Sequence, residues 1–181
     1  MTEMGIQIIA LGEMDGEVLE GLASRITPLS GLACRPLIFL ERPDFAYNRE
    51  REQFNAQKIL SFLLEHYPNP SSRIMGITGV DLYLPIFTYV FGLAQVGGRG
   101  AVVSTYRLDP HYYGMAVHQD LFRCRLEKTV LHEIAHLLGL THCRNRYCVL
   151  FSSSGIEDTD QKKAEFCPTC KTLLKWTLDG I

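Results

Sequence analysis

The stretch that decides the fold reads His132-Glu133-Ile134-Ala135-His136-Leu137-Leu138-Gly139-Leu140-Thr141-His142. Its first two histidines are spaced i and i+4, so their imidazoles lie one above the other on a helix face and can reach one tetrahedral metal ion at about 2.0–2.1 Å. Glu133 lies at another angle around the helix, from which its carboxylate can hold a metal-bound water without becoming a ligand. The spacing predicts a metal centre built on a helix.

The third histidine, His142, follows His136 at a distance where a continuing helix would point it away from the metal. Gly139 lies between them. Glycine adopts left-handed backbone conformations without steric penalty, so we expect the helix to end there and the chain to turn back beneath the metal. Three neutral imidazoles leave the fourth coordination position free for water, which is typical of a catalytic zinc site.

This combination of residue types indicates a zinc hydrolase. Zinc lowers the pKa of its bound water from about 15.7 toward 7. Glu133 would orient and deprotonate that water and then return the proton to a leaving amine. The predicted reaction is therefore amide hydrolysis of a peptide or protein substrate. An extended substrate could add to the edge of a sheet, and residues 88–94 are our candidate for that edge.

The size and charge of the chain narrow the remaining possibilities. With 181 residues and 46% hydrophobic content, we expect one domain spanning 1–181. A net charge of −2 does not indicate binding to nucleic acid or to an anionic membrane surface. No stretch approaches the roughly 18 apolar residues of a membrane span, and residues 1–4 lack the cationic start of a signal peptide. We expect a cytoplasmic monomer that binds neither nucleic acid nor membranes.

Hydrophobic periodicity before the motif predicts alternating strands and helices. We expect strands at 6–11, 34–40 and 74–82, with helices running from Asp15 to Pro28 and over 51–66. The first three strands should be parallel, because helices separate them. The glycine-rich segment 95–100 predicts an antiparallel hairpin between strands 88–94 and 101–106. Helical periodicity returns over 120–138 and 168–178. The expected fold is α+β, with a twisted mixed sheet of about five strands and flanking helices.

Four of the six cysteines gather in the last quarter of the chain, at Cys143, Cys148, Cys167 and Cys170. In a cytoplasmic protein such cysteines are metal ligands or buried thiols more often than disulfides. A Cys-x4-Cys pair combined with a Cys-x2-Cys pair favours zinc, and four thiolates at about 2.3 Å make a closed tetrahedral site without room for substrate. Such a site would tie the loop after His142 to the terminal helix. We interpret the two remaining cysteines as small buried hydrophobic residues.

The motif of residues 132–142 and the cysteines that follow it directly resemble the metzincin clan of zinc peptidases and, within it, the archaemetzincin family. The resemblance covers residues 132–170. It implies a metzincin-like fold, with the sheet and active-site helix in 1–142. Residues 143–181 would form a small cysteine-rich subdomain held together by a structural zinc ion. It also implies aminopeptidase-like cleavage at the N-termini of peptides.

The same resemblance assigns roles to individual residues. It implies two zinc ions: a catalytic ion on His132, His136 and His142, with Glu133 as the general base, and a structural ion on the four clustered cysteines. One position departs from the family pattern. Metzincins carry a methionine in a turn beneath the metal, and Leu150 stands there in this chain. An apolar exchange of similar volume costs under about 1.5 kcal/mol in a core, so we expect the metal site to persist and catalytic tuning to be affected.

A non-enzymatic function is the alternative. In this alternative, the chain is a zinc protein without catalytic activity, and its four-cysteine zinc site binds a protein or nucleic-acid partner. The basic residues available for such binding are Arg144, Arg146, Lys162, Lys163, Lys171 and Lys175. The near-neutral net charge argues against nucleic acid. If substitution of Glu133 abolishes hydrolysis while zinc is retained, the enzymatic function is supported over the binding function.

Overall fold

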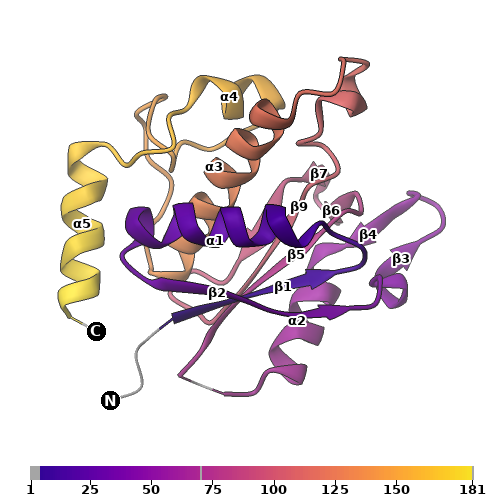
Figure 1. The fold of residues 1–181 in the computed structure, drawn as a ribbon, viewed down its shortest axis with the longest axis horizontal. Coiled ribbons are helices and arrows are strands. Elements are labelled where there is room, and N and C mark those ends of the chain that lie inside the picture. The colour runs from indigo at the N-terminus through magenta and orange to yellow at the C-terminus, as the bar shows by residue number, and fades with distance from the viewer. Residues whose placement is uncertain (1–4, 70, 181) are drawn as a thin grey trace.

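A five-stranded sheet with the order β2-β1-β5-β9-β8 forms the centre of the computed structural model, which describes residues 5–69 and 71–180 (Figure 1). Four of its strands are parallel: β2 (Ala33–Leu40), β1 (Gly5–Leu11), β5 (Arg73–Thr78) and β9 (Gly100–Ser104). β8 (Gly92–Ala94) lies antiparallel to β9 at the sheet edge. The predicted mixed sheet and its antiparallel hairpin are confirmed.

A second, four-stranded sheet has the order β3-β4-β6-β7. Its strands are β3 (Tyr47–Asn48), β4 (Gln53–Asn55), β6 (Leu82–Leu84) and β7 (Phe87–Val90). The prediction of continuous strands over 74–82 and 88–94 is therefore wrong, because each is divided between the two sheets. Both halves of each segment are apolar or β-branched, and periodicity alone does not show where a strand changes its partner.

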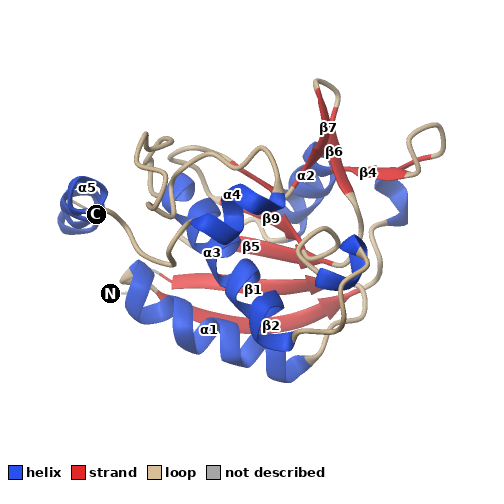
Figure 2. Ribbon diagram, turned by 90° about the horizontal axis from the view of Figure 1, so that it is seen from above, coloured by secondary structure: helices blue, strands red, loops and turns tan. Residues whose placement is uncertain are grey.

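Three long helices cover the central sheet. α1 (Gly16–Ser30) and α3 (Gln119–Leu137) lie on one face, and α2 (Ala56–His66) lies on the other (Figure 2). Successive strand residues point to opposite faces. In β1, Ile8 accordingly packs in the core beneath α1 and α3, while Ile9 packs in the core beneath α2. The hydrophobic layer beneath α1 and α3 thus fixes α3, the helix that carries the histidines.

The ends of two helices differ from the predictions. Asp15 caps α1 as expected, by accepting a 2.8 Å hydrogen bond from a backbone N–H. The helix nevertheless continues past Pro28 and ends at Gly31, whose φ is 73°. The predicted helix 51–66 begins later, at Ala56, because the preceding residues form β4 and the Asn55 side chain caps the helix. Proline and glycine are reliable boundary signals only to within about a turn.

Two helices follow the cysteine-rich loop. α5 (Pro168–Asp179) confirms the predicted terminal helix. α4 (Ile156–Gln161) was not predicted, since one isoleucine followed by five polar residues shows no helical periodicity. Arg125 of α3 holds it in place through two 2.7 Å contacts to the Asp160 carboxylate. The short 3-10 helices Asp44–Ala46 and Pro110–Tyr113 complete the described fold. No helix within the described residues has the length and apolar character needed to cross a membrane.

Candidate metal centres and active-site cleft

The end of α3 brings three imidazoles together. The Nε2 atoms of His132 and His136 are 3.1 Å apart. His142 joins them, and one ring nitrogen from each histidine lies within 4.8 Å of the others. Two ligands of a tetrahedral zinc ion with bonds of about 2.05 Å are about 3.3 Å apart. The observed spacing is therefore that of a metal site, and the predicted convergence of the three rings is confirmed.

Gly139 makes this convergence possible. Its φ of 87° lies in the left-handed region, directly after α3 ends. The N–H of Gly139 bonds to the carbonyl of His136 at 2.8 Å, and the N–H of Leu140 bonds to the carbonyl of Ala135 at 3.0 Å. These bonds close the helix and reverse the chain toward His142. The predicted role of the glycine is confirmed.

In each of the two helix histidines, a hydrogen bond at Nδ1 determines which ring nitrogen carries the proton. His132 Nδ1 lies 2.8 Å from the Val149 carbonyl, and His136 Nδ1 lies 2.7 Å from the Leu140 carbonyl. A carbonyl only accepts hydrogen bonds, so Nδ1 carries the proton and the Nε2 lone pair is left free. Two free lone pairs then face each other across 3.1 Å in a buried site. A cation between them removes this repulsion, and the donor set therefore fits zinc.

Burial keeps these rings neutral. Desolvation lowers the pKa of His132 to about 3, and it also lowers the pKa values of His136 and His142. Only the neutral imidazole offers a lone pair to a metal. His142 is the exposed member of the set, at the mouth of the cleft. The buried rings are therefore neutral and able to bind a metal ion, and the site is accessible from the side of His142.

Glu133 lies between α3 and the edge strand of the central sheet. Its side chain packs against Gly92 of β8 so closely that a Cβ added there would lie 2.7 Å from Glu133 Oε1. Burial raises the pKa of Glu133 to about 8, while the nearby charge of Lys162 acts in the opposite direction. The carboxyl group thus has a pKa near neutrality, where it can both take up and release a proton.

A cleft of about 570 Å³ opens over these residues. One wall comes from β7 and β8, and the facing wall from the segment around α4. The cleft is lined by Leu84, residues 87–94, Val96, Thr129, His132, Glu133, His136, Thr141, His142, residues 152–154, Thr159 and Lys162. The wall that includes β8 is the end of the central sheet and lies directly beside Glu133, so an extended peptide could reach both.

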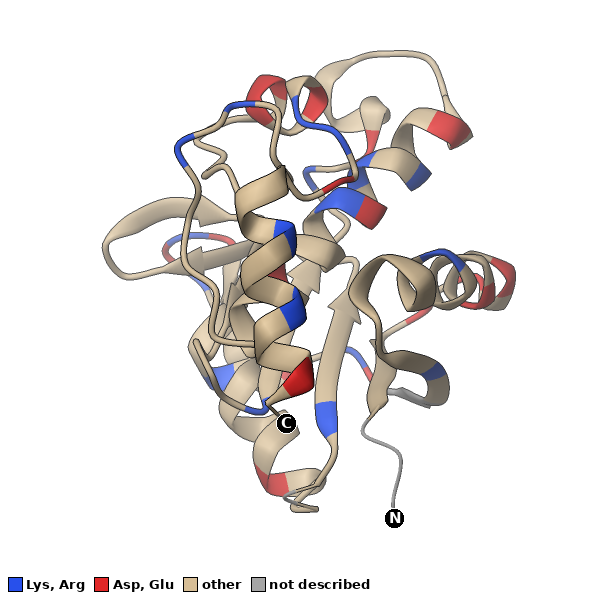
Figure 3. Cartoon of the chain, turned by 90° about the vertical axis from the view of Figure 1, so that its left-hand side faces the viewer, with Lys and Arg blue, Asp and Glu red and all other residues tan. Residues whose placement is uncertain are grey.

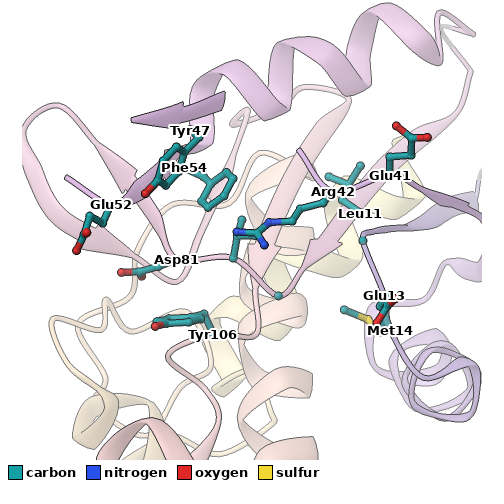
Figure 4. A pocket seen from close by; sticks show the side chains of 13 residues that line it. Leu11, Glu13, Met14, Glu41, Arg42, Tyr47, Glu52, Phe54, Asp81 and Tyr106 are labelled. Atoms are coloured by element: carbon teal, nitrogen blue, oxygen red, sulfur yellow. The ribbon is translucent and has the colours of Figure 1, made fainter. Parts of the chain in front are cut away.

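A larger cavity, of about 1280 Å³, lies at the carboxyl ends of β1 and β5 (Figure 4). Neither histidine nor cysteine contributes to its described lining. Four carboxylates among the described residues line it, at Glu13, Glu41, Glu52 and Asp81, and that of Asp81 already forms two 2.7 Å contacts with Arg107 and accepts a hydrogen bond from Gln53. Size therefore does not identify the reactive site in this chain, whereas the chemistry of the lining residues does.

The four clustered cysteines also converge. Their Sγ atoms lie within 4.8 Å of one another, and those of Cys143 and Cys167 are 3.7 Å apart. A tetrahedral zinc–thiolate site with bonds of about 2.3 Å has edges of about 3.8 Å, whereas a disulfide bond measures about 2.05 Å. Backbone N–H groups also point at Sγ of Cys143 and Cys148, at 3.4 and 3.3 Å. The geometry fits four thiolates around one metal ion.

Residues 149–151, which lie between Cys148 and Cys167 in the sequence, form the floor of the cleft. Leu150, which occupies the methionine position, is fully buried in the core. Its neighbours face the site: the Val149 carbonyl contacts His132, and the Phe151 carbonyl accepts a 2.7 Å hydrogen bond from Lys162 Nζ. Leucine is therefore accommodated within the core at this position.

The structure changes the interpretation of two sets of residues. Lys162, which we assigned to the basic surface of the tail, is only 5% exposed and lines the cleft. The partner-binding alternative thus loses one of its basic residues. On the side that α5 occupies, basic and acidic positions are interspersed (Figure 3). Of the two isolated cysteines, Cys34 is buried as predicted, whereas Cys124 is half-buried.

Comparison with known proteins agrees with this geometry. The model of peptidase family M54 matches residues 12–176. The archaemetzincin of Methanocaldococcus jannaschii is 36% identical over 167 residues, which cover 92% of this chain and 90% of that protein. The archaemetzincin of Aeropyrum pernix is 41% identical over 165 residues, covering 88% and 87%. The chain belongs to the archaemetzincin family.

Solved archaemetzincins share the fold. The Methanopyrus kandleri structure superposes with a TM-score of 0.84 at 29% identity, covering 98% of this chain and 96% of that one. The Archaeoglobus fulgidus structure, solved in complex with malonate, gives 0.81 at 33% identity, covering 93% and 99%. As an archaemetzincin, the chain is a zinc metallopeptidase that acts on peptides or proteins. The predicted family, fold class and enzyme class are confirmed.

Proposed function

We propose that His132, His136 and His142 hold the catalytic zinc and that Glu133 is the general base of peptide-bond hydrolysis. The observation that carries the proposal is the pair of Nδ1–carbonyl contacts at 2.8 and 2.7 Å, which leave both Nε2 lone pairs facing a common centre. When bound, zinc supplies an acidic water and polarises the scissile carbonyl. The remaining steps fall to side chains of the cleft.

Glu133 is placed to move the protons of the reaction. As a carboxylate it would take a proton from the attacking water, and as a carboxylic acid it would pass that proton to the leaving amine. Its burial against β8 excludes bulk water, which would otherwise exchange that proton. An extended substrate added along β8 would lie next to this carboxyl group, and main-chain hydrogen bonds to the strand would set its register.

The four cysteines support the proposal of a second, structural zinc ion. Four thiolates that lie within 4.8 Å of one another leave no vertex for substrate once a metal is bound. Cys167 and Cys170 lie at the start of α5, while Cys143 and Cys148 lie in the loop that follows the catalytic histidines. The second ion would therefore attach α5 to the active-site loop.

Cleavage at peptide N-termini is a finer proposal, which comes from the family resemblance. A free α-amino group is a cation and calls for a carboxylate partner. Among the described cleft-lining residues the carboxylate is Glu133, which the reaction already uses. The geometry therefore supports peptide hydrolysis more strongly than N-terminal specificity. Comparing turnover of peptides with free and with acetylated N-termini tests this point.

The decisive experiment pairs the wild type with Glu133→Gln in the fully zinc-loaded protein. We expect the variant to lose about 10²–10⁴-fold in the rate of cleavage of a quenched fluorescent peptide library, which is the usual contribution of general acid–base catalysis. Zinc content should stay the same, because glutamate is not a ligand. A wild type that carries both metal ions yet cleaves no member of the library would overturn the proposal.

We also propose a cytoplasmic monomer that binds neither nucleic acid nor membranes. The net charge of −2 supports the expected lack of binding to nucleic acid and to membranes. Sedimentation of the purified protein over a range of concentrations tests the monomer, and salt-dependent retention on nucleic acid or anionic vesicles would contradict the rest.

A further inference from the structure

Lys162 places a buried positive charge in the active-site cleft. The residue is only 5% exposed, yet it lines the same cavity as Glu133 and the three histidines. Burial lowers the pKa of its ammonium group to about 8, against the opposing influence of Glu133 and Asp158. The charged form therefore predominates at neutral pH. A buried charge is costly unless something compensates for it.

Partners of this ammonium group within the protein are few. Nζ donates one 2.7 Å hydrogen bond, to the Phe151 carbonyl, although an ammonium group has three N–H donors. Among the described residues no carboxylate forms an ion pair with Lys162, whereas the half-buried Arg107 and the buried Arg125 each have one. Two of its N–H donors are therefore available to a ligand that enters the cleft.

The position of this charge is rigid. Lys162 directly follows α4, and its backbone N–H bonds to the Asp158 carbonyl. α4 itself is fixed to α3, through the Arg125–Asp160 ion pair and through Lys128 Nζ, which donates to two carbonyls of α4 at 3.1 and 3.2 Å. A charge that is held in advance binds an anion with little loss of conformational entropy.

The cleft is also bridged near Lys162. The hydroxyl of Tyr89 on β7 donates a 3.0 Å hydrogen bond to the Ser154 carbonyl, so the two walls meet there. The Ser154 N–H in turn bonds to Asp158, the first-turn residue of α4 whose carboxylate lies near Lys162. A peptide that lies in the cleft is limited in length at such a bridge, and a chain end or a short side chain suits that place.

From the unpaired, rigid cation and the bridged cleft we infer that Lys162 binds a substrate carboxylate, so that this peptidase prefers peptides with a negative charge close to the scissile bond. The inference deepens the proposed function and rests on it. The carboxylate has two possible sources: the C-terminus of the peptide, or the side chain of an Asp or Glu residue. Both present the same acceptor oxygens to the ammonium group.

The test separates binding from catalysis by using zinc-loaded protein with Glu133→Gln. Calorimetry would measure the affinity of three probes: acetyl-Ala-Ala-Ala with a free carboxylate, its C-terminal amide, and acetyl-Ala-Ala-Asp amide. We expect at least one carboxylate probe to bind about tenfold or more tightly than the neutral amide, as a charge-assisted hydrogen bond predicts. Preference for the first probe identifies the C-terminus as the source, and preference for the third identifies a side chain.

Variants then assign the preference to Lys162. In the same background, Lys162→Met should remove the difference between the probes, Lys162→Arg should retain part of it, and the exposed neighbour Lys163→Met should leave it unchanged. Lys128→Met controls for loosening of α4, because this lysine holds α4 without lining the cleft. Zinc content is measured for each variant.

Three outcomes would overturn the inference. If the preference survives in Lys162→Met, zinc alone binds the carboxylate. If Lys162→Met weakens all three probes equally, the residue has only a structural role. If, with Glu133 intact, Lys162→Met slows turnover of neutral peptides while the probe preference persists, the charge acts on the reacting carbonyl and not on a substrate carboxylate. An inactive wild type that still shows the lysine-dependent preference would refute the proposed reaction and leave the binding site standing.

Discussion

The two candidate metal centres are neighbours in sequence but are built in opposite ways. The histidine site takes two ligands from one turn of α3, a helix fixed by the core, and obtains the third through a single glycine. The cysteine site takes its ligands from two segments that are 24 residues apart at Cys143 and Cys167. The first site is set by local geometry and by the core, whereas the second must be assembled by folding of the tail.

The difference extends to exposure and chemistry. His142 faces the cleft, and the neutral imidazoles leave room for a reactant. The cysteine cluster instead has backbone N–H groups directed at its sulfurs, which stabilise thiolate charge without admitting a substrate. A preformed open site suits catalysis, and a closed site that forms with the fold suits stabilisation.

The largest expected effect is loss of the assembled site. Cys170→Ser removes a thiolate from the proposed structural zinc site, and zinc binding contributes about 10 kcal/mol or more in comparable small sites. We expect zinc content to fall from two ions to one per chain, with faster hydrogen exchange across the cysteine loop and α5. Cys124→Ser is the matched control and should retain both ions. Two ions per chain in Cys170→Ser would show that the cysteines do not form this site.

The next effect probes the preformed site. In Gly92→Ala, the new Cβ would lie 2.7 Å from Glu133 Oε1, so the carboxyl group must move. Misplacing a catalytic group by about 1 Å can cost about 10²-fold in rate, and we expect a loss of that order in kcat with unchanged zinc content. Gly21→Ala, where a Cβ would meet nothing within 4 Å, is the control. Unchanged turnover in Gly92→Ala would argue against Glu133 as the base.

A smaller effect tests the turn that completes the histidine site. Gly139 has a φ of 87°, a conformation that costs L-residues with a Cβ about 1–2 kcal/mol. Gly139→Ala should lower the free energy of unfolding by about that amount and weaken zinc binding through His142. Chemical denaturation and zinc-competition titration measure the two effects. If neither changes, the strain at this turn does not control the third ligand.

The smallest effect concerns the floor of the cleft. Leu150→Met restores the side chain that metzincins carry beneath the metal, in a site where the leucine is already fully buried. A volume-conserving exchange should alter the free energy of unfolding by less than about 1.5 kcal/mol, and zinc content should not change. Thermal unfolding and peptide turnover, measured together, would show whether the sulfur alters catalysis. A large loss of stability would mean that leucine has reshaped the floor.

The sequence predicted the features that depend on short spacings. Two histidines on one helix turn, a glycine before the third and paired cysteines need only local geometry, and the structure brings each group together. The division of strand 74–82, the existence of α4 and the location of Lys162 depend on contacts between distant segments, such as the one between Arg125 and Asp160. Lys162 offered no signal of its own, because a lysine in a polar stretch is usually exposed.

His142 and Cys143 are consecutive residues, so a single peptide bond joins the two metal centres. Binding of an ion at either centre restricts the conformations of the chain at the other centre. The second ion therefore binds to ligands that are already partly ordered. Loading should be positively cooperative, with each ion bound more tightly when the other centre is occupied, as a chelator titration would show. If the ions are released stepwise, and the affinity of each centre does not depend on occupancy of the other, the two centres are not coupled through this bond.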